Sequence, residues 1–225
     1  MGTDDTALAA ADDIAERLRA LADPSLVDGI VESRSPGKPV LGIRIPPLRG
    51  AVRDGLKEAH LSADGDTARA AERLWFARFH EEELAACMML RLARTPCDPG
   101  LVVRWAVNLD NWLSVDELGG WVGAAVAAGQ VDLPQLAPLA GAGSPWQRRL
   151  YVVSLITAMR GDLDPAAVPE LVELFHDTDK PVRMAVVWLV KSVLKARPQV
   201  SALFLGASDR PFPAPVRRLL EREPA

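Results

Sequence analysis

The residues with the clearest chemical potential lie between Asn108 and Trp121, a segment that reads N-L-D-N-W-L-S-V-D-E-L-G-G-W. Trp112 and Asp116 stand four residues apart, so in a helix both project from one face, one turn apart. A carboxylate beside a large aromatic ring suits a surface that holds something flat, electron-poor or cationic. Two structural interpretations remain open. In the first, Trp112 is a core anchor. In the second, Asp116 is an acid favoured by the helix dipole, or part of a Ser114–Glu117 capping box.

A second group of this kind lies near the C-terminus, where Trp188, Lys191 and Lys195 share one face of a predicted helix. Buried lysines are rare, so this tryptophan lies on the basic side of the helix. The opposite side holds enough aliphatic residues to build the core: Val186, Leu189, Val190, Val193 and Leu194. The alternative is that Trp188 is an ordinary half-buried aromatic residue.

Two consecutive arginines, Arg148 and Arg149, follow the helix-start signal Ser144-Pro145. The free backbone N–H groups and the dipole of a first helical turn favour an anion, and guanidinium groups add to that preference. The pair is therefore a candidate phosphate clamp. The alternative is a surface ion pair.

The elements that position these residues are predicted to be helices. Aspartate followed by proline starts a helix, because aspartate caps the first turn and proline needs no donor there. This signal occurs at Asp23, Asp98 and Asp164, and in looser form at Asp179. Strand signals are nearly absent. The predicted helices are 7–22, one from Pro24, one from Leu48, 67–76, 79–95, 99–107, 114–128, 133–140, 145–160, 165–176, 182–196, 199–205 and 214–222.

Short helices with short connections should pair as antiparallel hairpins, which predicts an all-α solenoid of the HEAT kind. The second helix of each pair would line a concave binding face. We expect a single domain over residues 1–225, with acidic cap helices at 1–36, the repeats at 37–205 and a tail helix at 206–225. Trp112, Asp116, Arg149 and Trp188 should then line one groove.

Composition excludes several classes of protein. Of 225 residues, 49% are hydrophobic, and no apolar run approaches the roughly 20 residues of a membrane span. The first 36 residues hold eight acids against three bases, unlike a signal peptide, so we expect a cytoplasmic protein. From Ser144 onward there are 12 bases and 9 acids, which favours a basic C-terminal part. Two cysteines and three scattered histidines predict reduced thiols, no metal and no cofactor.

Taken in order, these motifs resemble the DNA-alkylation-repair glycosylases of the AlkD type over about residues 37 to 205. They are Gly42-Ile-Arg-Ile-Pro-Pro-Leu-Arg49, Leu74-Trp75, His80-Glu-Glu82, Trp112-x-x-x-Asp116, Trp146-x-x-Arg149 and Ala185-Val-Val-Trp188 with Arg197-Pro198. The chain departs from the family pattern at Val40-Leu41, where an aromatic pair is common. Its first 36 residues also lack the tyrosine-bearing helices of the family.

The resemblance implies a HEAT-like fold that excises N3- and N7-alkylated purines from duplex DNA. It implies that Asp116 is catalytic, that Trp112 and Trp188 contact the deoxyribose at the lesion, and that Arg149 holds the DNA backbone. Arg148, Lys191 and Lys195 are the further expected DNA contacts. The expected partner is double-stranded DNA with alkylated purines, bound by a monomer. Two alternatives remain: a non-catalytic module that binds damaged or branched DNA, and a protein-interaction scaffold.

Overall fold

The computed structural model describes residues 3–34, 36–61, 64–206 and 210–221, and every regular element within them is helical. The predicted all-α class is therefore confirmed. The contacts group the chain into two compact units. The first unit comprises residues 1–96 and 110–117, and the second comprises residues 97–109 and 118–225. The expected single domain with its three segments stays a prediction.

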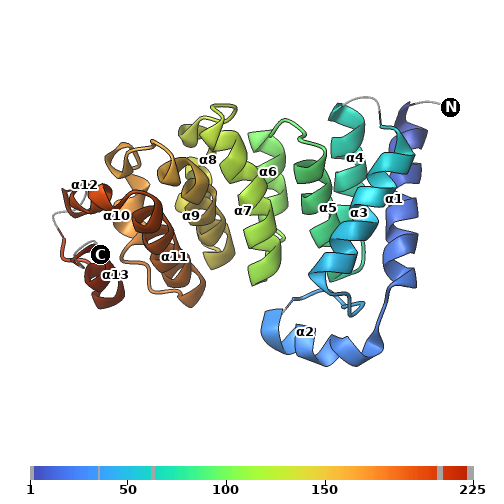
Figure 1. Ribbon diagram of the computed structural model, residues 1–225, viewed down its shortest axis with the longest axis horizontal. Helices are drawn as coiled ribbons and strands as arrows, with labels where there is room; N and C mark the ends of the chain where they lie inside the picture. Colours follow the sequence, from blue (N-terminus) through green and yellow to red (C-terminus); the bar gives the residue numbers. More distant parts are fainter. Residues whose placement is uncertain (1–2, 35, 62–63, 207–209, 222–225) are drawn as a thin grey trace. The chain divides into compact units, whose positions relative to one another are not determined.

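The first unit contains four helices that lie side by side in Figure 1, together with a short helix and the start of another. Helix α5 packs against α3 and α4, and α1 packs against the same two helices. The elements are α1 (Thr3–Ala20), a 3-10 turn (Pro24–Leu26), α2 (Val27–Arg34), α3 (Ile45–Ala59), α4 (Asp64–Trp75), α5 (His80–Leu92) and the first residues of α7 (Trp112–Ala127).

The buried face of α1 differs from the one that its large residues suggest. Ile14 and Leu18 are fully buried, whereas Leu8 and Leu21 are exposed. Small side chains complete the buried face: Ala7, Ala10, Ala11 and Ala15. Because alanine side chains are small, neighbouring helices can approach this face of α1 closely.

The loop before α3 is fixed by a glycine. Gly42 has φ 86°, a left-handed conformation that side chains disfavour, and a Cβ built there would lie 2.0 Å from the carbonyl oxygen of Asp23. The backbone N–H of Asp23 in turn donates to the Leu41 carbonyl at 3.0 Å. The glycine of the first family-like motif therefore allows two loops to meet.

The second unit is built around α9, which packs against α8 and α11 (Figure 1). Its buried residues include Leu150, Val152 and Leu155 on α9, and Leu189 and Val193 on α11. The elements are α6 (Pro99–Ala106), the rest of α7, α8 (Leu133–Ala140), α9 (Pro145–Arg160), a 3-10 turn (Pro165–Ala167), α10 (Glu170–Leu174), α11 (Lys180–Ala196), a 3-10 turn (Pro198–Val200), α12 (Ser201–Gly206) and α13 (Ala214–Leu220). Residue 222, which ended the last predicted helix, lies outside the described residues.

The predicted helix starts are largely confirmed. Asp23, Asp98 and Asp164 each accept a hydrogen bond from the backbone N–H two residues later, at 3.0, 2.8 and 2.8 Å. The prediction of one helix over 165–176 was wrong. Val168 is extended (φ −124°, ψ 78°) because it precedes Pro169, so the segment divides into a 3-10 turn and the short α10.

Both cysteines are buried free thiols. Burial raises the pKa of Cys97 to about 12 and raises the pKa of Cys87, in the interior of α5, well above its usual value. Among the residues described, no helix is long and apolar enough to cross a membrane.

Candidate active site

The first candidate residues lie at the start of α7. Asn111 caps this helix, because its side-chain Oδ1 accepts a hydrogen bond from the Ser114 backbone N–H at 2.9 Å. Trp112 and Asp116 are therefore in the first two turns, on one face, and both are half-buried. The Ser114–Glu117 capping box was a wrong alternative, since Ser114 lies inside the helix and is fully buried. Trp112 is not a fully buried core anchor.

A buried polar network holds the start of α7 in place. Glu83 of α5 is almost fully buried and forms an ion pair with Lys38 Nζ at 2.9 Å. Burial raises the pKa of the Glu83 carboxyl, while Lys38 and a hydrogen bond with Ser114 partly oppose that shift. The Ser114 hydroxyl also accepts from Asn111 Nδ2 at 3.0 Å. The capping residue of α7 is thus connected through Ser114 to a charged pair inside the first unit.

The adjacent carboxylates are engaged as well. Asp110 accepts from the Gly37 backbone N–H at 3.0 Å and from Asn111 Nδ2 at 2.9 Å. Glu117, the residue after Asp116, faces the guanidinium groups of Arg49 and Arg91 at 3.7 and 3.6 Å. The surroundings of Asp116 therefore contain basic groups as well as acids.

Glu81 explains why two family-like motifs occur together. This fully buried carboxylate accepts hydrogen bonds from the backbone N–H groups of residues 41, 42 and 43, at 2.9, 3.0 and 3.2 Å. Its neighbour Glu82 accepts from the Phe79 N–H at 2.9 Å and pairs with Arg19 at 2.7 Å. The His80-Glu-Glu run thus fixes the loop that leads into α3, and its role is structural.

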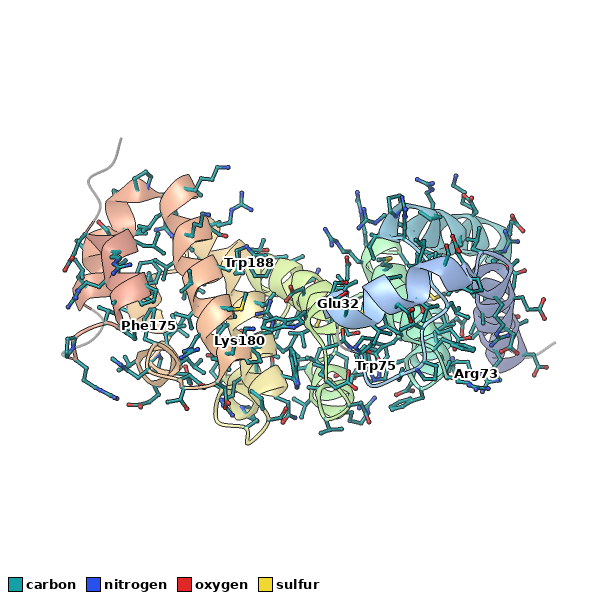
Figure 2. The ribbon with its side chains drawn as sticks, turned by 90° about the horizontal axis from the view of Figure 1, so that it is seen from below. Glu32, Arg73, Trp75, Phe175, Lys180 and Trp188 are labelled. Atoms are coloured by element: carbon teal, nitrogen blue, oxygen red, sulfur yellow. The ribbon has the colours of Figure 1, made fainter. Side chains whose placement is uncertain are left out.

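The second group of candidates lies on α11 in the second unit. Trp188 projects from this helix with 42% of its surface exposed (Figure 2), and Lys191 and Lys195 are exposed too. The aliphatic side is buried as predicted at Val186, Leu189, Val190 and Val193, whereas Leu194 is half-buried. An exposed tryptophan followed on the same face by two cationic side chains is a surface suited to an anionic, partly aromatic ligand.

The two arginines of α9 are held by the protein itself. Ser144 caps the helix as predicted, accepting from the Trp146 N–H at 3.3 Å. Arg148 forms ion pairs with Asp177 at 2.7 Å and Asp179 at 2.6 Å, and these hydrogen bonds raise its pKa. Arg149 is only 5% exposed and donates from Nη1 to the Pro181 carbonyl at 2.9 Å. The ion-pair alternative thus describes Arg148, and a phosphate contact at Arg149 stays a prediction.

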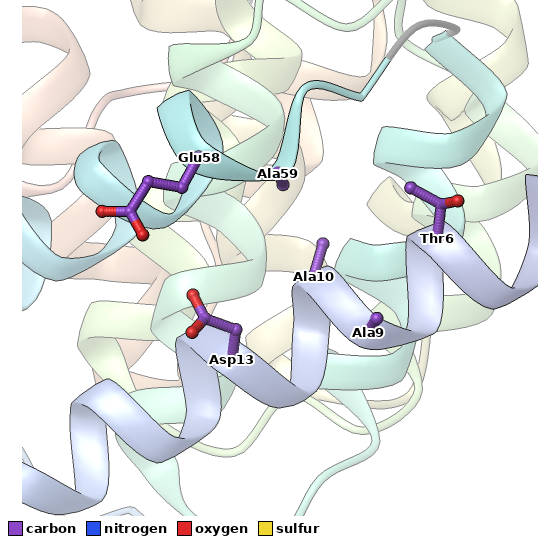
Figure 3. Close-up of a pocket in the computed structure, with 6 residues that line it drawn as sticks. All are labelled: Thr6, Ala9, Ala10, Asp13, Glu58 and Ala59. Carbon is purple, nitrogen blue, oxygen red and sulfur yellow. The ribbon is translucent and has the colours of Figure 1, made fainter.

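The pocket between α1 and α3 offers no catalytic group (Figure 3). Alanine methyls line much of it, and its two carboxylates, Asp13 and Glu58, both pair with Arg17. Among the described residues there is also no group of three or more His, Cys, Asp or Glu that could hold a metal ion. Asp116, in contrast, combines partial exposure with an aromatic neighbour, Trp112, on its own face of α7.

Comparison with known proteins identifies the family. Residues 14–219 match the family model for the DNA alkylation repair enzyme. The chain belongs to the DNA alkylation repair enzyme family. This match begins inside the acidic segment 1–36 and extends past residue 205, so the family likeness covers more of the chain than the motifs alone indicate.

Solved structures agree with the fold of this family. A predicted DNA alkylation repair enzyme from Enterococcus faecalis superimposes with a TM-score of 0.72 over 90% of this chain and 96% of its own. The two sequences are 17% identical, so the likeness concerns the helical-repeat fold. A search of curated proteins finds no significant match.

The structure places further polar residues at the candidate site that the sequence analysis did not predict. Lys38, Glu83 and Asn111 surround the start of α7, yet none was predicted as part of the site. Glu83 follows two other glutamates at the start of α5, and no spacing rule gives its partner on a distant loop. The expected groove joins residues from both units, so it stays a prediction.

Proposed function

We propose that this protein is a DNA glycosylase that hydrolyses the N-glycosidic bond of N3- and N7-alkylated purines in duplex DNA. The observation that carries the proposal is the pair Trp112 and Asp116, half-buried on one face of α7 in a DNA alkylation repair enzyme. Both residues match the positions that the family resemblance assigns to catalysis.

The chemistry follows from the charge of the substrate. An N3- or N7-alkylated purine is cationic, so the glycosidic bond breaks with its electron pair moving onto the base, which leaves neutral. The sugar is left with positive charge at C1′. The carboxylate of Asp116 would stabilise that charge and orient water, whose oxygen bonds to C1′ while its proton passes to solvent. The products are the free base and an abasic site.

Aromatic faces support the same step. Trp112 beside Asp116, and Trp188 on the second unit, would contact the lesion-bearing DNA, and each face attracts a cation by roughly 0.5–2 kcal/mol. We assign the backbone contacts to Lys191, Lys195, Arg148 and Arg149. The two lysines are exposed and best placed, because Arg148 and Arg149 already bind protein groups. A monomer acting on chromosomal DNA in the cytoplasm completes the proposal.

The test is release of 7-methylguanine and 3-methyladenine from methylated duplex DNA at saturating protein. Asp116→Asn should keep the fold and the DNA affinity while the single-turnover rate falls by about 10²–10³, the usual cost of losing one preorganised electrostatic group. Uracil should not be released, because the proposed site protonates no leaving base. Equal rates for wild type and a folded Asp116→Asn variant would remove Asp116 from the mechanism.

The second candidate is a non-catalytic module that binds damaged or branched DNA, and the third is a protein-interaction scaffold, which modest positive charge favours. The guanidinium of Arg148 is held by Asp177 and Asp179, which reduces the positive charge available at the start of α9. Salt-dependent DNA binding without release of any alkylpurine would support this second function. Absence of DNA binding would support a protein-interaction scaffold.

A further inference from the structure

A second charged arrangement in the first unit lies beside Asp116 and involves none of the residues assigned above. Glu117 is the next residue of α7, and its carboxylate faces Arg49 of α3 and Arg91 of α5, at 3.7 and 3.6 Å. The glutamate side chain is 12% exposed, whereas the arginine side chains are 49% and 57% exposed. The acid is therefore held inside while both basic groups extend toward solvent.

The geometry leaves these guanidinium groups able to bind an anion. Both separations exceed the 2.7–3.2 Å of an N–H···O hydrogen bond, so Glu117 attracts the arginines without fixing their donors. Within the residues that the structure describes, neither arginine has a second acidic partner. The two guanidinium groups exceed the Glu117 carboxylate by one positive charge before Asp116 is counted, and the planar fork of each matches a phosphate.

The basic surface continues along α3. Arg53 and Lys57 follow Arg49 at four-residue spacing, so the three lie on one flank of the helix, and all are exposed. The acids Asp54 and Glu58 occupy the next flank, where Asp54 lies 3.7 Å from Arg53 and Glu58 pairs with Arg17 on α1. From Arg49 to Lys57 the helix rises about 12 Å, a length over which duplex DNA carries on the order of seven negative charges.

The surface formed by Arg49 and Arg91 lies near the proposed catalytic residue, Asp116. Asp116 and Glu117 are both half-buried, as are residues 112, 113 and 120, whereas residues 114, 115, 118 and 119 are buried. Asp116 and Glu117 therefore belong to the same partly exposed side of α7. A group bound by Arg49 and Arg91 would therefore lie beside the proposed catalytic carboxylate. The negative charge there would be held by Glu117, so the arginines need not pair with Asp116.

We propose that Arg49 and Arg91, positioned by Glu117, form a phosphate clamp that binds a backbone phosphodiester of DNA next to Asp116. The clamp rests on the proposed function, because it requires DNA to be the ligand. Arg49 and Arg91 supply the charge and the donors, and Glu117 is a positioning residue that keeps two like charges close together. Arg53 and Lys57 extend the contact along the same strand.

The first experiment measures the affinity for an undamaged duplex at several salt concentrations. Each lost phosphate contact should reduce the slope of log affinity against log salt by about 0.9, so Arg49→Ala and Arg91→Ala should each lose that amount and the double variant about 1.8. Between 50 and 200 mM salt, one contact corresponds to about a 3.5-fold change. Arg49→Lys should keep the slope.

Arg73→Ala is the matched control, because Arg73 is an exposed arginine of the same unit that pairs with an acid on another helix, Asp12. Its slope should equal that of wild type. Equal slopes for Arg49→Ala, Arg91→Ala and Arg73→Ala would overturn the clamp, and so would a wild-type protein that binds no DNA.

Glu117→Gln tests the positioning role through the sign of its effect. If the carboxylate were only a surface charge, its removal would strengthen DNA binding at every salt concentration. If it positions the arginines, binding should weaken despite the lost negative charge. Tighter binding by a folded Glu117→Gln variant would overturn the role of Glu117.

Base release distinguishes failure of the clamp from failure of the proposed function. Wild type that releases alkylpurines while the arginine variants keep full salt dependence would refute the clamp alone. Wild type that binds DNA with the predicted clamp slopes but releases no base would refute the glycosylase and leave the clamp in place.

Discussion

The two units use buried charge in opposite ways. In the first unit the buried charged groups are acids that accept, as when Glu81 binds the N–H groups of residues 41–43. In the second unit the buried charged group is Arg149, which donates to the Pro181 carbonyl, and the half-buried Arg197 likewise donates to the carbonyls of Met159 and Leu163. A charged group that binds an internal partner in this way is not available to bind a ligand.

The charge of each surface therefore differs from the charge of its sequence. In the first unit Glu81, Glu82 and Glu83 are buried, whereas Arg49 and Arg91, which face Glu117, remain exposed. The C-terminal part is richer in bases, yet several of its arginines are held by acids or carbonyls. Net charge along a sequence predicts a binding surface only after internal partners are subtracted.

The largest expected effect comes from the acceptor that fixes the loop before α3. Glu81→Ala would leave three buried N–H groups without a partner, each costing about 1–3 kcal/mol, so the free energy of unfolding should fall by about 3 kcal/mol or more. Urea denaturation measures this loss. Glu81→Gln, which keeps one acceptor oxygen and the volume, should lose less. Equal midpoints for wild type and Glu81→Ala would refute the structural role.

The corresponding donor in the second unit is Arg149, where two roles can be separated. Arg149→Ala should lower stability by about 1–3 kcal/mol, because it removes the hydrogen bond from a buried guanidinium to the Pro181 carbonyl. If Arg149 also binds a phosphate, the salt slope of DNA binding should fall by about 0.9. Arg149→Lys keeps the charge and should preserve the slope while stability still falls. An unchanged slope in both variants would make Arg149 a purely structural residue.

The two tryptophans test whether the units contribute equally to the reaction. Trp112→Ala and Trp188→Ala each remove a cation-attracting face worth roughly 0.5–2 kcal/mol, so each should slow excision by about 2- to 30-fold and weaken binding at the lesion. Trp188 is the more exposed, so its loss should leave stability nearly unchanged. Wild-type rates for Trp188→Ala would confine the chemistry to the first unit.

The smallest effect concerns the pH dependence of stability. Burial raises the pKa of Glu83 above its usual 4.5, so the folded protein holds this proton more tightly than the unfolded chain does. Its contribution to stability is full below pH 4.5 and is lost as the pH rises through the raised pKa. Glu83→Gln should flatten the fall in unfolding free energy across that window, measured by urea denaturation at successive pH values. Parallel curves would show that Glu83 does not titrate there.

Sequence alone predicted the helices well, because their starts are local. Asp98 and Ser144 cap the turns that follow them, and these signals need no tertiary information. The sequence did not indicate the cap of α7, nor the small residues that complete a buried helix face. Asn111, not Ser114, caps α7, and the buried face of α1 is completed by alanines, which hydrophobic spacing of large residues does not indicate.

The candidate site was predicted only in part, for the same reason. Periodicity placed Trp188, Lys191 and Lys195 on one exposed face, since a single helix decides that outcome. The partners of Arg148 lie about thirty residues away, and the partner of Glu83 lies on a loop 45 residues earlier. Contacts between distant segments follow from packing, which a local pattern does not encode.

The hidden cysteines have a consequence for a repair protein in a damaged cell. The agents that alkylate purines are electrophiles, and a cysteine thiolate is a better nucleophile than a DNA base. The pKa of Cys97 is raised to about 12, so its thiol stays protonated at pH 7. Cys87, in the middle of α5, is fully buried. Both cysteines are thus poor targets for these electrophiles, so the exposure that alkylates DNA spares the thiols of the protein.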